Sequence, residues 1–530
     1  MSLAWRDRLV LIGLAVIVNG IVAALISQPG YVDAYYYFNG GLAIAGGHAL
    51  TEPYIWNFAY ATGSLPVPAF GFWQPLASVL TAAGIVALPF LPPFDAAQAV
   101  YVLMAAVLPL LTYHVASRLG ERRHAMLAGL LTVFSGFYVF YWSLPETFTP
   151  FALSGATTLI LTGEGLNRPR RWIWAAAGGC AALAHLTRAD GLLLIAVVVM
   201  MPLLRNSLPG RERFFAAALA MGGYTIVMLP WYLRNLATFG AIQAPGGLNS
   251  LWLVEYNDLF NYPTNLSASR YFAAGWGTIL TTKLDALTLN LAHFLAEDNL
   301  VFLLPFTLIS GWRCWRSNGL FPALLYGVLL FTAMTAAFSL VGARGAFFHS
   351  AGALLPFIFS AAALGLDDVL HWMAARRHWN FESSSRFFGA AMIALAALVT
   401  AFVCGSKMIS SPAHSGEIAY NQMHAAYPTI GAELDTMGVS PDSPVMSNDP
   451  PGFFYFTGHG GIPLPNGDED TLLRAADDYH VQYLVVDQNL PGDLTHLYLT
   501  GPTSRRLRLI KTYDGNEGKV QLYQIIPASP

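Results

Sequence analysis

Residues 28–47 read QPGYVDAYYYFNGGLAIAGG and directly follow an apolar run at 9–27. They place one carboxylate, that of Asp33, beside three consecutive tyrosines and a glycine-rich tail. An apolar run of about 20 residues is long enough to cross a bilayer as a helix. Asp33 therefore comes immediately after the first predicted membrane span, where a single acidic residue indicates a specific structural or functional role.

The whole composition agrees with a membrane protein. The chain of 530 residues is 55% hydrophobic and only 11% charged, whereas about a quarter of the residues are charged in an ordinary soluble protein. Apolar runs long enough to cross a bilayer predict a polytopic helical protein with about eleven spans. They lie near 9–27, 95–117, 124–143, 147–163, 172–187, 190–204, 214–230, 298–312, 319–341, 347–366 and 387–405.

Other features exclude several classes of protein. The first run follows Arg6 and Arg8 but lacks a small-residue cleavage site, so we expect a retained anchor rather than a removed signal peptide. The cysteines, Cys180, Cys314 and Cys404, show no CxxC spacing and predict neither a zinc site nor a disulfide framework. The net charge of −3 does not indicate nucleic-acid binding.

Basic residues predict the orientation, because Lys and Arg in short loops stay on the cytoplasmic side. Arginine clusters occupy every second connection, at 118–123, 168–171, 205–213, 313–316 and 376–377. They all fall inside, together with the N-terminus, only if the apolar stretch 72–90 does not cross the membrane. Its two prolines favour a helix on or in the outer leaflet. The alternative, an ordinary span, would invert every later loop.

This orientation divides the chain into two parts. Residues 1–405 form the predicted membrane domain, with long extracytoplasmic loops at 28–94 and 231–297. Residues 406–530 predict a small extracytoplasmic α/β domain, with strands within 443–449 and 481–489 and a helix at 470–480. In the second outer loop, 267–296 predicts an amphipathic helix along the membrane.

Ionisable groups at membrane depth are costly and indicate function. Asp33 is the strongest candidate for a general base, because a carboxylate at a wet outer mouth can accept a proton from an incoming hydroxyl or amine. An alternative is that Asp33 caps a short helix. Other such groups collect at the predicted outer ends of the spans: Glu146, Arg188, Asp190, Arg234, Arg344 and His349.

Three of these groups are candidates for binding an anion. Arg188, Arg344 and His349 lie on the side that the positive-inside rule leaves poor in cations, and arginine binds phosphate with two parallel hydrogen bonds. A structural ion pair between Arg188 and its neighbour Asp190 is the alternative explanation for that arginine.

Glu146 opens a span, so favourable electrostatics at a helix start also explain it. With Asp33 it could hold a divalent cation, but two carboxylates on separate elements are a weak metal signal, and we predict no metal site. For contacts to a sugar or an acceptor, the candidates are Tyr35, Tyr36, Tyr256 and Asp258.

The assembled pattern resembles the membrane glycosyltransferases of the C-type (GT-C) fold, and within them the bacterial relatives of protein O-mannosyltransferases and lipid A aminoarabinose transferases. The likeness rests on the acid after the first span (Asp33), the outer segment 53–80, the acid that opens a later span (Glu146) and the turn LTRADGLLL at 186–194. It covers about residues 1–405. Many members carry a second acid beside the first, whereas Asp33 is followed by Ala34.

The resemblance implies an inverting sugar transfer from a polyprenyl-phosphate donor at the outer face of a cell membrane. Asp33 would then be the base, and the arginines with His349 would bind the donor phosphate. Glu146 is the second catalytic candidate, which could bind a metal or orient the acceptor. The acceptor could be a protein, a lipid or a glycan. Two other classes stay open: a transporter or flippase of a lipid-linked sugar, and a non-catalytic factor for envelope assembly.

Overall fold

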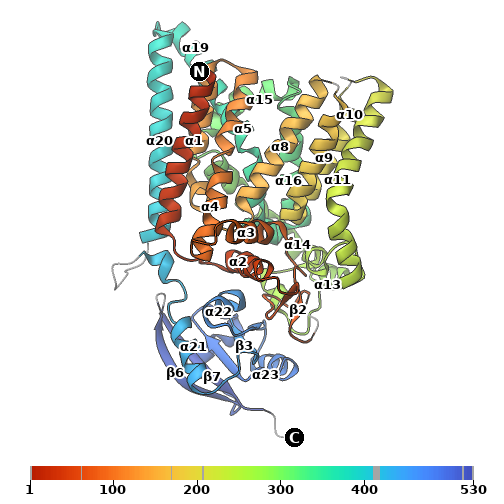
Figure 1. Ribbon diagram of the computed structural model, residues 1–530, viewed down its shortest axis with the longest axis vertical. Helices are drawn as coiled ribbons and strands as arrows, with labels where there is room; N and C mark the ends of the chain where they lie inside the picture. The colour runs from red at the N-terminus through yellow and green to blue at the C-terminus, as the bar shows by residue number, and fades with distance from the viewer. Residues whose placement is uncertain are drawn as a thin grey trace.

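The computed structural model describes residues 3–60, 63–168, 170–205, 208–409, 418–515 and 518–527, without the side chains of 313–315 and 409. A long helical bundle occupies one end of the molecule and a small domain with a sheet the other (Figure 1). The helices of the bundle are α1 (Leu3–Leu25), α4 (Pro93–Ala105), α5 (Leu108–Leu119), α6 (Arg122–Val133), α7 (Val139–Trp142), α8 (Phe148–Asn167), α9 (Arg171–Thr187), α10 (Leu192–Leu204), α11 (Gly210–Phe239), α15 (Leu304–Arg316), α16 (Phe321–Thr332), α17 (Ser339–Val341), α18 (Phe347–Ala351), α19 (Leu355–Arg377) and α20 (Phe381–Ile409).

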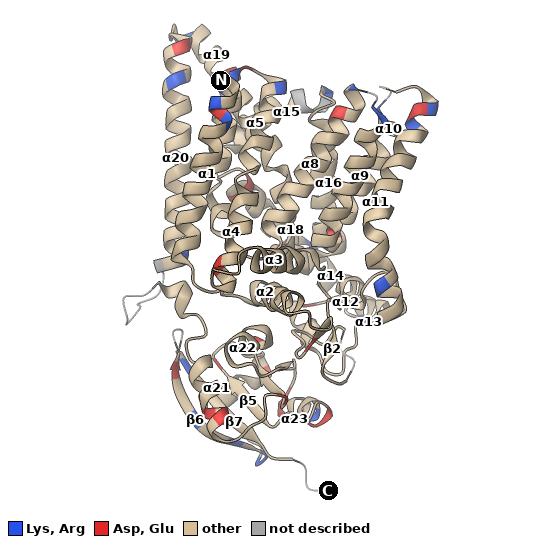
Figure 2. Cartoon of the chain, viewed as in Figure 1, with Lys and Arg blue, Asp and Glu red and all other residues tan. Residues whose placement is uncertain are grey.

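The bundle confirms a multi-pass helical membrane protein. Within the described residues, five helices are long and apolar enough to cross a bilayer, and a sixth is added if the two pieces 122–133 and 136–142, bent by 46°, form one span. Every predicted run contains at least part of a helix, although the total of eleven spans stays a prediction. Figure 2 shows Lys and Arg gathered at the end of the bundle that holds the N-terminus, opposite the small domain.

Two short helices lie across the other end of the bundle, between it and the small domain (Figure 1). They are α2 (Val32–Ala45) and α3 (Leu76–Ala87). With 12 residues, α3 is only about 18 Å long, whereas the hydrocarbon core is about 30 Å thick. The apolar stretch 72–90 therefore contains no helix long enough to span. Close packing holds α3 to α2, because Gly41 leaves room for the Thr81 side chain.

The second outer loop differs from the prediction of one amphipathic helix. Helix α13 (Ala268–Ala273) ends before Gly275, whose φ of 84° lies in the left-handed region that favours glycine. Helix α14 (Trp276–His293) then starts anew. The remaining outer elements are α12 (Pro245–Asn249) and the strands β1 (Thr51–Glu52) and β2 (Val67–Pro68), which pair antiparallel.

The C-terminal part contains a five-stranded sheet in the order β4-β3-β5-β7-β6. The predicted strands and helix are present, but the antiparallel hairpin β6–β7 at the end of the chain was missed. The elements are α21 (Tyr427–Thr436), β3 (Val445–Ser447), α22 (Pro450–Thr457), β4 (Gly461–Pro463), α23 (Glu469–Asp478), β5 (Tyr483–Val486), α24 (Thr495–Leu499), β6 (Leu507–Gly515) and β7 (Gly518–Ile525).

Candidate active site

Asp33 lies in the first turn of α2, at the end of the bundle that faces the small domain. The N-cap position belongs to Tyr31, which makes no capping hydrogen bond through its side chain. The alternative that Asp33 serves as the helix cap is therefore wrong. The carboxylate is partly exposed, and no side chain in the described parts of the chain forms a hydrogen bond or ion pair with it.

The surroundings of Asp33 raise its pKa from 3.8 to about 7. Burial is the largest cause, and the nearby charge of Glu146 raises the pKa further. Arg188 opposes this shift and Asp449 adds to it. A carboxyl group whose pKa lies near the working pH is well suited to general base catalysis, because it is ionised yet basic enough to take a proton.

Glu146 is fully buried in the turn between α7 and α8. Its Oε1 accepts a hydrogen bond of 3.0 Å from the Tyr31 hydroxyl. Its Oε2 accepts one of 2.7 Å from the Thr147 hydroxyl and another from the Thr147 backbone N–H. Burial raises the pKa of Glu146. Since both oxygens have partners within the protein, the geometry favours a residue that fixes the turn beside Asp33.

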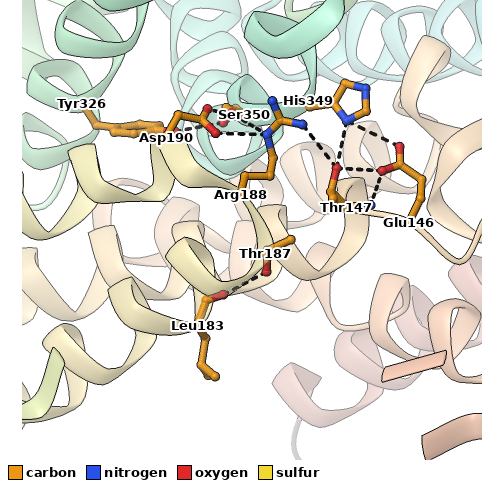
Figure 3. A network of polar contacts seen from close by, with 9 residues as sticks. All are labelled: Glu146, Thr147, Leu183, Thr187, Arg188, Asp190, Tyr326, His349 and Ser350. Carbon is orange, nitrogen blue, oxygen red and sulfur yellow. Dashed lines mark hydrogen bonds and ion pairs between the residues drawn. The ribbon is translucent and has the colours of Figure 1, made fainter. Parts of the chain in front are cut away.

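Arg188 is the centre of the polar network shown in Figure 3. Its Nε lies 3.1 Å from Asp190 Oδ1 and 3.0 Å from Ser350 Oγ, and its Nη1 lies 3.4 Å from Thr147 Oγ1. The ion pair with Asp190 is thus present, and it holds the guanidinium in one orientation. No partner for Nη2 is found in the described part of the chain, which leaves this edge of the guanidinium for an anion.

His349 joins the same network from α18. Its Nδ1 lies 2.9 Å from Thr147 Oγ1 and 3.4 Å from Glu146 Oε1, and its ring stacks on Phe148 with 3.8 Å between ring centroids. The Thr147 hydroxyl has one hydrogen, which it donates to Glu146. The Nδ1 of His349 is therefore the donor to Thr147. In the neutral ring, Nε2 is then a hydrogen-bond acceptor, so this geometry does not supply the donor to a phosphate that was predicted for His349.

Arg344 approaches from the neighbouring turn at 342–346, where Gly345 has a φ of 112°. Its exposed guanidinium lies 4.5 Å from the ring centroid of Tyr256. Burial raises the pKa of Tyr256 to about 12, the charge of Asp33 adds to this, and that of Arg344 opposes it. Tyr256 thus lies within electrostatic reach of both Asp33 and Arg344, and the outer loop closes this side of the site.

Three of the predicted ligand residues lie elsewhere. Tyr35 and Tyr36 are completely buried, Tyr35 against Tyr455 and Tyr36 against Trp73, so neither ring can contact a sugar. Asp258 is also buried and accepts hydrogen bonds from two backbone N–H groups of its own loop and from Arg270. These bonds lower its pKa and give it a structural role in closing the loop.

Two side chains close to Asp33 and Glu146 escaped the prediction. Tyr31 bridges to Glu146, as described above. Tyr37 is close enough to Asp33, Arg188 and Glu146 for their charges to change its pKa. The signal was the helical spacing, because residues i and i+4 share one face of a helix and Tyr37 follows Asp33 by four positions. Tyr37 therefore lies on the same face of the helix as Asp33, whereas Tyr35 and Tyr36 do not.

The ligands for a divalent cation do not fit well. Both oxygens of Glu146 are occupied by Tyr31 and Thr147, so Asp33 would be the main carboxylate left. Within the ranges described above, no group of three or more His, Cys, Asp or Glu side chains could hold a metal ion. A cation such as Ca²⁺ takes six to eight oxygen ligands. The donor groups described here are therefore too few for such a cation.

Comparisons with solved structures identify the fold. ArnT from Cupriavidus metallidurans bound to undecaprenyl phosphate matches with a TM-score of 0.59 and 14% sequence identity over 100% of both chains. The oligosaccharyltransferase of Archaeoglobus fulgidus in complex with Zn and sulfate matches with a TM-score of 0.55 and 14% identity over 97% of this chain and 74% of that one. At such low identity the likeness shows the fold, which is the GT-C fold.

No protein-family model matches the sequence. A comparison with curated proteins also finds no match.

Proposed function

We propose that this protein is a glycosyltransferase that moves a sugar from a polyprenyl-phosphate donor to an acceptor at the outer face of the membrane. The observation that carries the proposal is the position of Asp33, a partly exposed carboxylate with a pKa of about 7. Arg188, paired with Asp190, is near enough for its charge to act on Asp33. Arg344 contacts Tyr256, which the charge of Asp33 also reaches. The GT-C fold, shared with a protein that binds undecaprenyl phosphate, supports the same reaction.

Asp33 takes the proton of the acceptor while the acceptor oxygen or nitrogen attacks the anomeric carbon. The bond from that carbon to the phosphate oxygen breaks, and its electron pair leaves with the polyprenyl phosphate. Arg188 and Arg344 bind the phosphate as its negative charge develops, and His349 holds Thr147 beside Arg188. Fixed donors stabilise such charge effectively because they need no reorganisation during the reaction. A single displacement inverts the anomeric centre.

An apolar cavity of about 420 Å³ suits the isoprenoid tail of such a donor. It is formed between α15, α16, α18 and α19, and its lining includes Leu308, Leu324, Phe331, Phe347, Phe357 and Ile358. Phe347 belongs to the same helix as His349, so the cavity reaches the region of the proposed phosphate site. A transport route is less well supported, because the charged side chains gather mainly toward the two ends of the bundle (Figure 2).

The test is the Asp33→Asn variant in purified protein. It removes the proposed base while preserving the shape of the side chain, so we expect transfer to fall by at least about 100-fold, the scale of general base catalysis. Release of polyprenyl phosphate from radiolabelled lipid-linked sugars, with a membrane extract as acceptor, measures it. The matched control is Asp95→Asn at the start of α4. Wild-type turnover by Asp33→Asn would refute the base assignment.

A further inference from the structure

A second cavity lies between the start of α2 and the C-terminal part of the chain. Its volume is about 280 Å³. Tyr31 and Val32 line it from the membrane domain, and the opposite wall comes from the loop before α21 and the ends of the strands. Its polar lining includes His424, Tyr427, Asn448, Asp449 and Lys519.

This cavity adjoins the candidate active site. Tyr31 lines the cavity and donates its hydroxyl hydrogen to Glu146. Asp449 also lines it, and its charge is near enough to raise the pKa of Asp33. Asp33 does not itself line the cavity, but its neighbour Val32 does, so a molecule in the cavity lies near the proposed base.

A buried polar group of the cavity has no hydrogen-bond partner within the described chain. Tyr427 is 2% exposed, and its hydroxyl has no hydrogen-bond partner within the described chain. An unpaired buried hydroxyl costs free energy that a ligand can recover. His424 adopts a φ of 61°, a conformation that is uncommon for any residue other than glycine. Its ring stacks on Tyr427 at 4.6 Å, and its Nε2 lies 3.1 Å from Asp449 Oδ2.

The charges of the cavity limit what it can bind. Among the described lining residues, Asp449 and Asp487 are acidic and Lys519 is basic. With Asp33 and Glu146 close by, a phosphate would meet several negative charges. The lining offers both donors (Tyr427, Lys519) and acceptors (Asp449, Asn448). A sugar hydroxyl uses both, because it donates and accepts hydrogen bonds.

We propose that this cavity binds the acceptor, and that the acceptor is an uncharged saccharide whose hydroxyl reaches Asp33. The inference rests on the proposed glycosyl transfer and adds the class of acceptor to it. Tyr427 binds one saccharide hydroxyl with its own hydroxyl group, and Asp449 accepts from another. The C-terminal part of the chain thereby selects the acceptor, while the bundle holds the donor.

The test supplies purified full-length protein with a radiolabelled polyprenyl-phosphate hexose and three sets of acceptor probes. These are neutral disaccharides and methyl glycosides, peptides that contain Ser and Thr, and glucosamine 1-phosphate. We expect transfer to the neutral saccharides. Transfer to the peptides or to the phosphate sugar, with none to the neutral saccharides, would overturn the inference.

The matched variants are Tyr427→Phe and Tyr523→Phe. Tyr427→Phe removes one unpaired hydroxyl, so we expect the acceptor KM to rise about tenfold, equal to roughly 1.4 kcal/mol, with kcat and donor affinity unchanged. Tyr523 is buried in the same domain, bonds Leu497 O and does not line the cavity, so its variant keeps the wild-type KM. An unchanged KM in Tyr427→Phe would also overturn the inference.

A membrane extract separates the two hypotheses. Turnover with the extract, but with none of the saccharide probes, overturns the acceptor inference and keeps the proposed transferase. If folded wild-type protein turns over no donor even with the extract, the proposed function fails, and the acceptor inference fails with it.

Discussion

At the scale of single residues, the chemistry depends on how neighbours tune Asp33. The pKa of this carboxyl is about 7 because burial and the acids Glu146 and Asp449 outweigh Arg188. The phenols of Tyr31, Tyr37 and Tyr256 also lie within reach of its charge. A base must be ionised to act, so activity should rise as the pH rises through about 7 and fall below it.

Asp449→Asn should shift the pH at which activity begins to rise to a lower value. The substitution removes a negative charge that disfavours ionised Asp33, so the pKa of Asp33 falls and the base stays ionised in more acidic solution. Asp449 Oδ1 also caps α22 by accepting from the Gly452 N–H at 2.9 Å, and Asn retains that cap. The profile of kcat against pH, at saturating donor and acceptor, measures the shift. If the rise of kcat stays at the same pH or moves to higher pH, Asp33 is not the base whose pKa Asp449 raises.

Sequence reasoning reached part of this site. Asp33, Glu146, Arg188, Arg344 and His349 were selected because ionisable groups are costly at the ends of membrane spans, and the structure brings them to one end of the bundle. Of the predicted tyrosines, Tyr256 lies at the site, whereas Tyr35 and Tyr36 are buried, because they do not share the helix face of Asp33. Asp449 was missed because it follows Asp33 by more than 400 positions, and only the docking of the C-terminal part brings the two together.

At the scale of the elements, close helix packing positions Arg188. This residue directly follows α9, and α9 packs on α11 through small residues. A Cβ on Gly178 would lie 1.9 Å from Ala220 O, and one on Gly223 would lie 2.1 Å from Ala175 O. Small residues let helix backbones approach closely in a membrane, where burial gives little driving force for association.

Gly178→Ala should therefore separate α9 from α11 and displace Arg188. We expect the free energy of unfolding to fall by about 1–3 kcal/mol, the usual cost of overpacking, and donor binding to weaken. Gly179→Ala is the matched control, because its Cβ would lie 3.8 Å from the nearest atom, in ordinary contact. Thermal unfolding at one scan rate and donor affinity give the readouts. Equal unfolding temperatures for the two variants would contradict the packing argument.

The elements themselves were largely predictable because long apolar runs report on helices in a membrane. The short stretch 72–90 was interpreted correctly as lacking a spanning helix, from its prolines and the arginine pattern. The break at Gly275 and the hairpin β6–β7 were not foreseen. A single glycine inside a helical pattern is compatible with a continuous helix, and β6 alternates only weakly between buried and exposed positions.

At the scale of the whole molecule, the small domain is docked on the membrane domain through backbone contacts. The outer segment at 53–55 runs beside β4: the Ile55 N–H donates to Gly461 O and the Gly461 N–H donates to Pro53 O, each at 3.0 Å. A second bridge joins Asn261 to Asn466. Residues of both predicted outer loops thus contact the small domain, and the proposed acceptor cavity lies between the same two parts of the chain.

Gly460→Ala should loosen this docking. A Cβ at this position would lie 2.0 Å from Pro53 O, a backbone atom that cannot move aside without displacing the segment beside β4. We expect the amides of Ile55 and Gly461 to exchange with deuterium about tenfold faster, which corresponds to roughly 1.4 kcal/mol of lost protection. The acceptor KM should rise as well, because the two walls of the cavity belong to the two parts of the chain. Gly492→Ala is the control, since open space surrounds that position. Hydrogen exchange followed by mass spectrometry measures the exchange rates. Faster exchange without a change in acceptor KM would show that the cavity does not depend on this edge of the sheet. Unchanged exchange would show that the contact at Gly460 does not hold the domain.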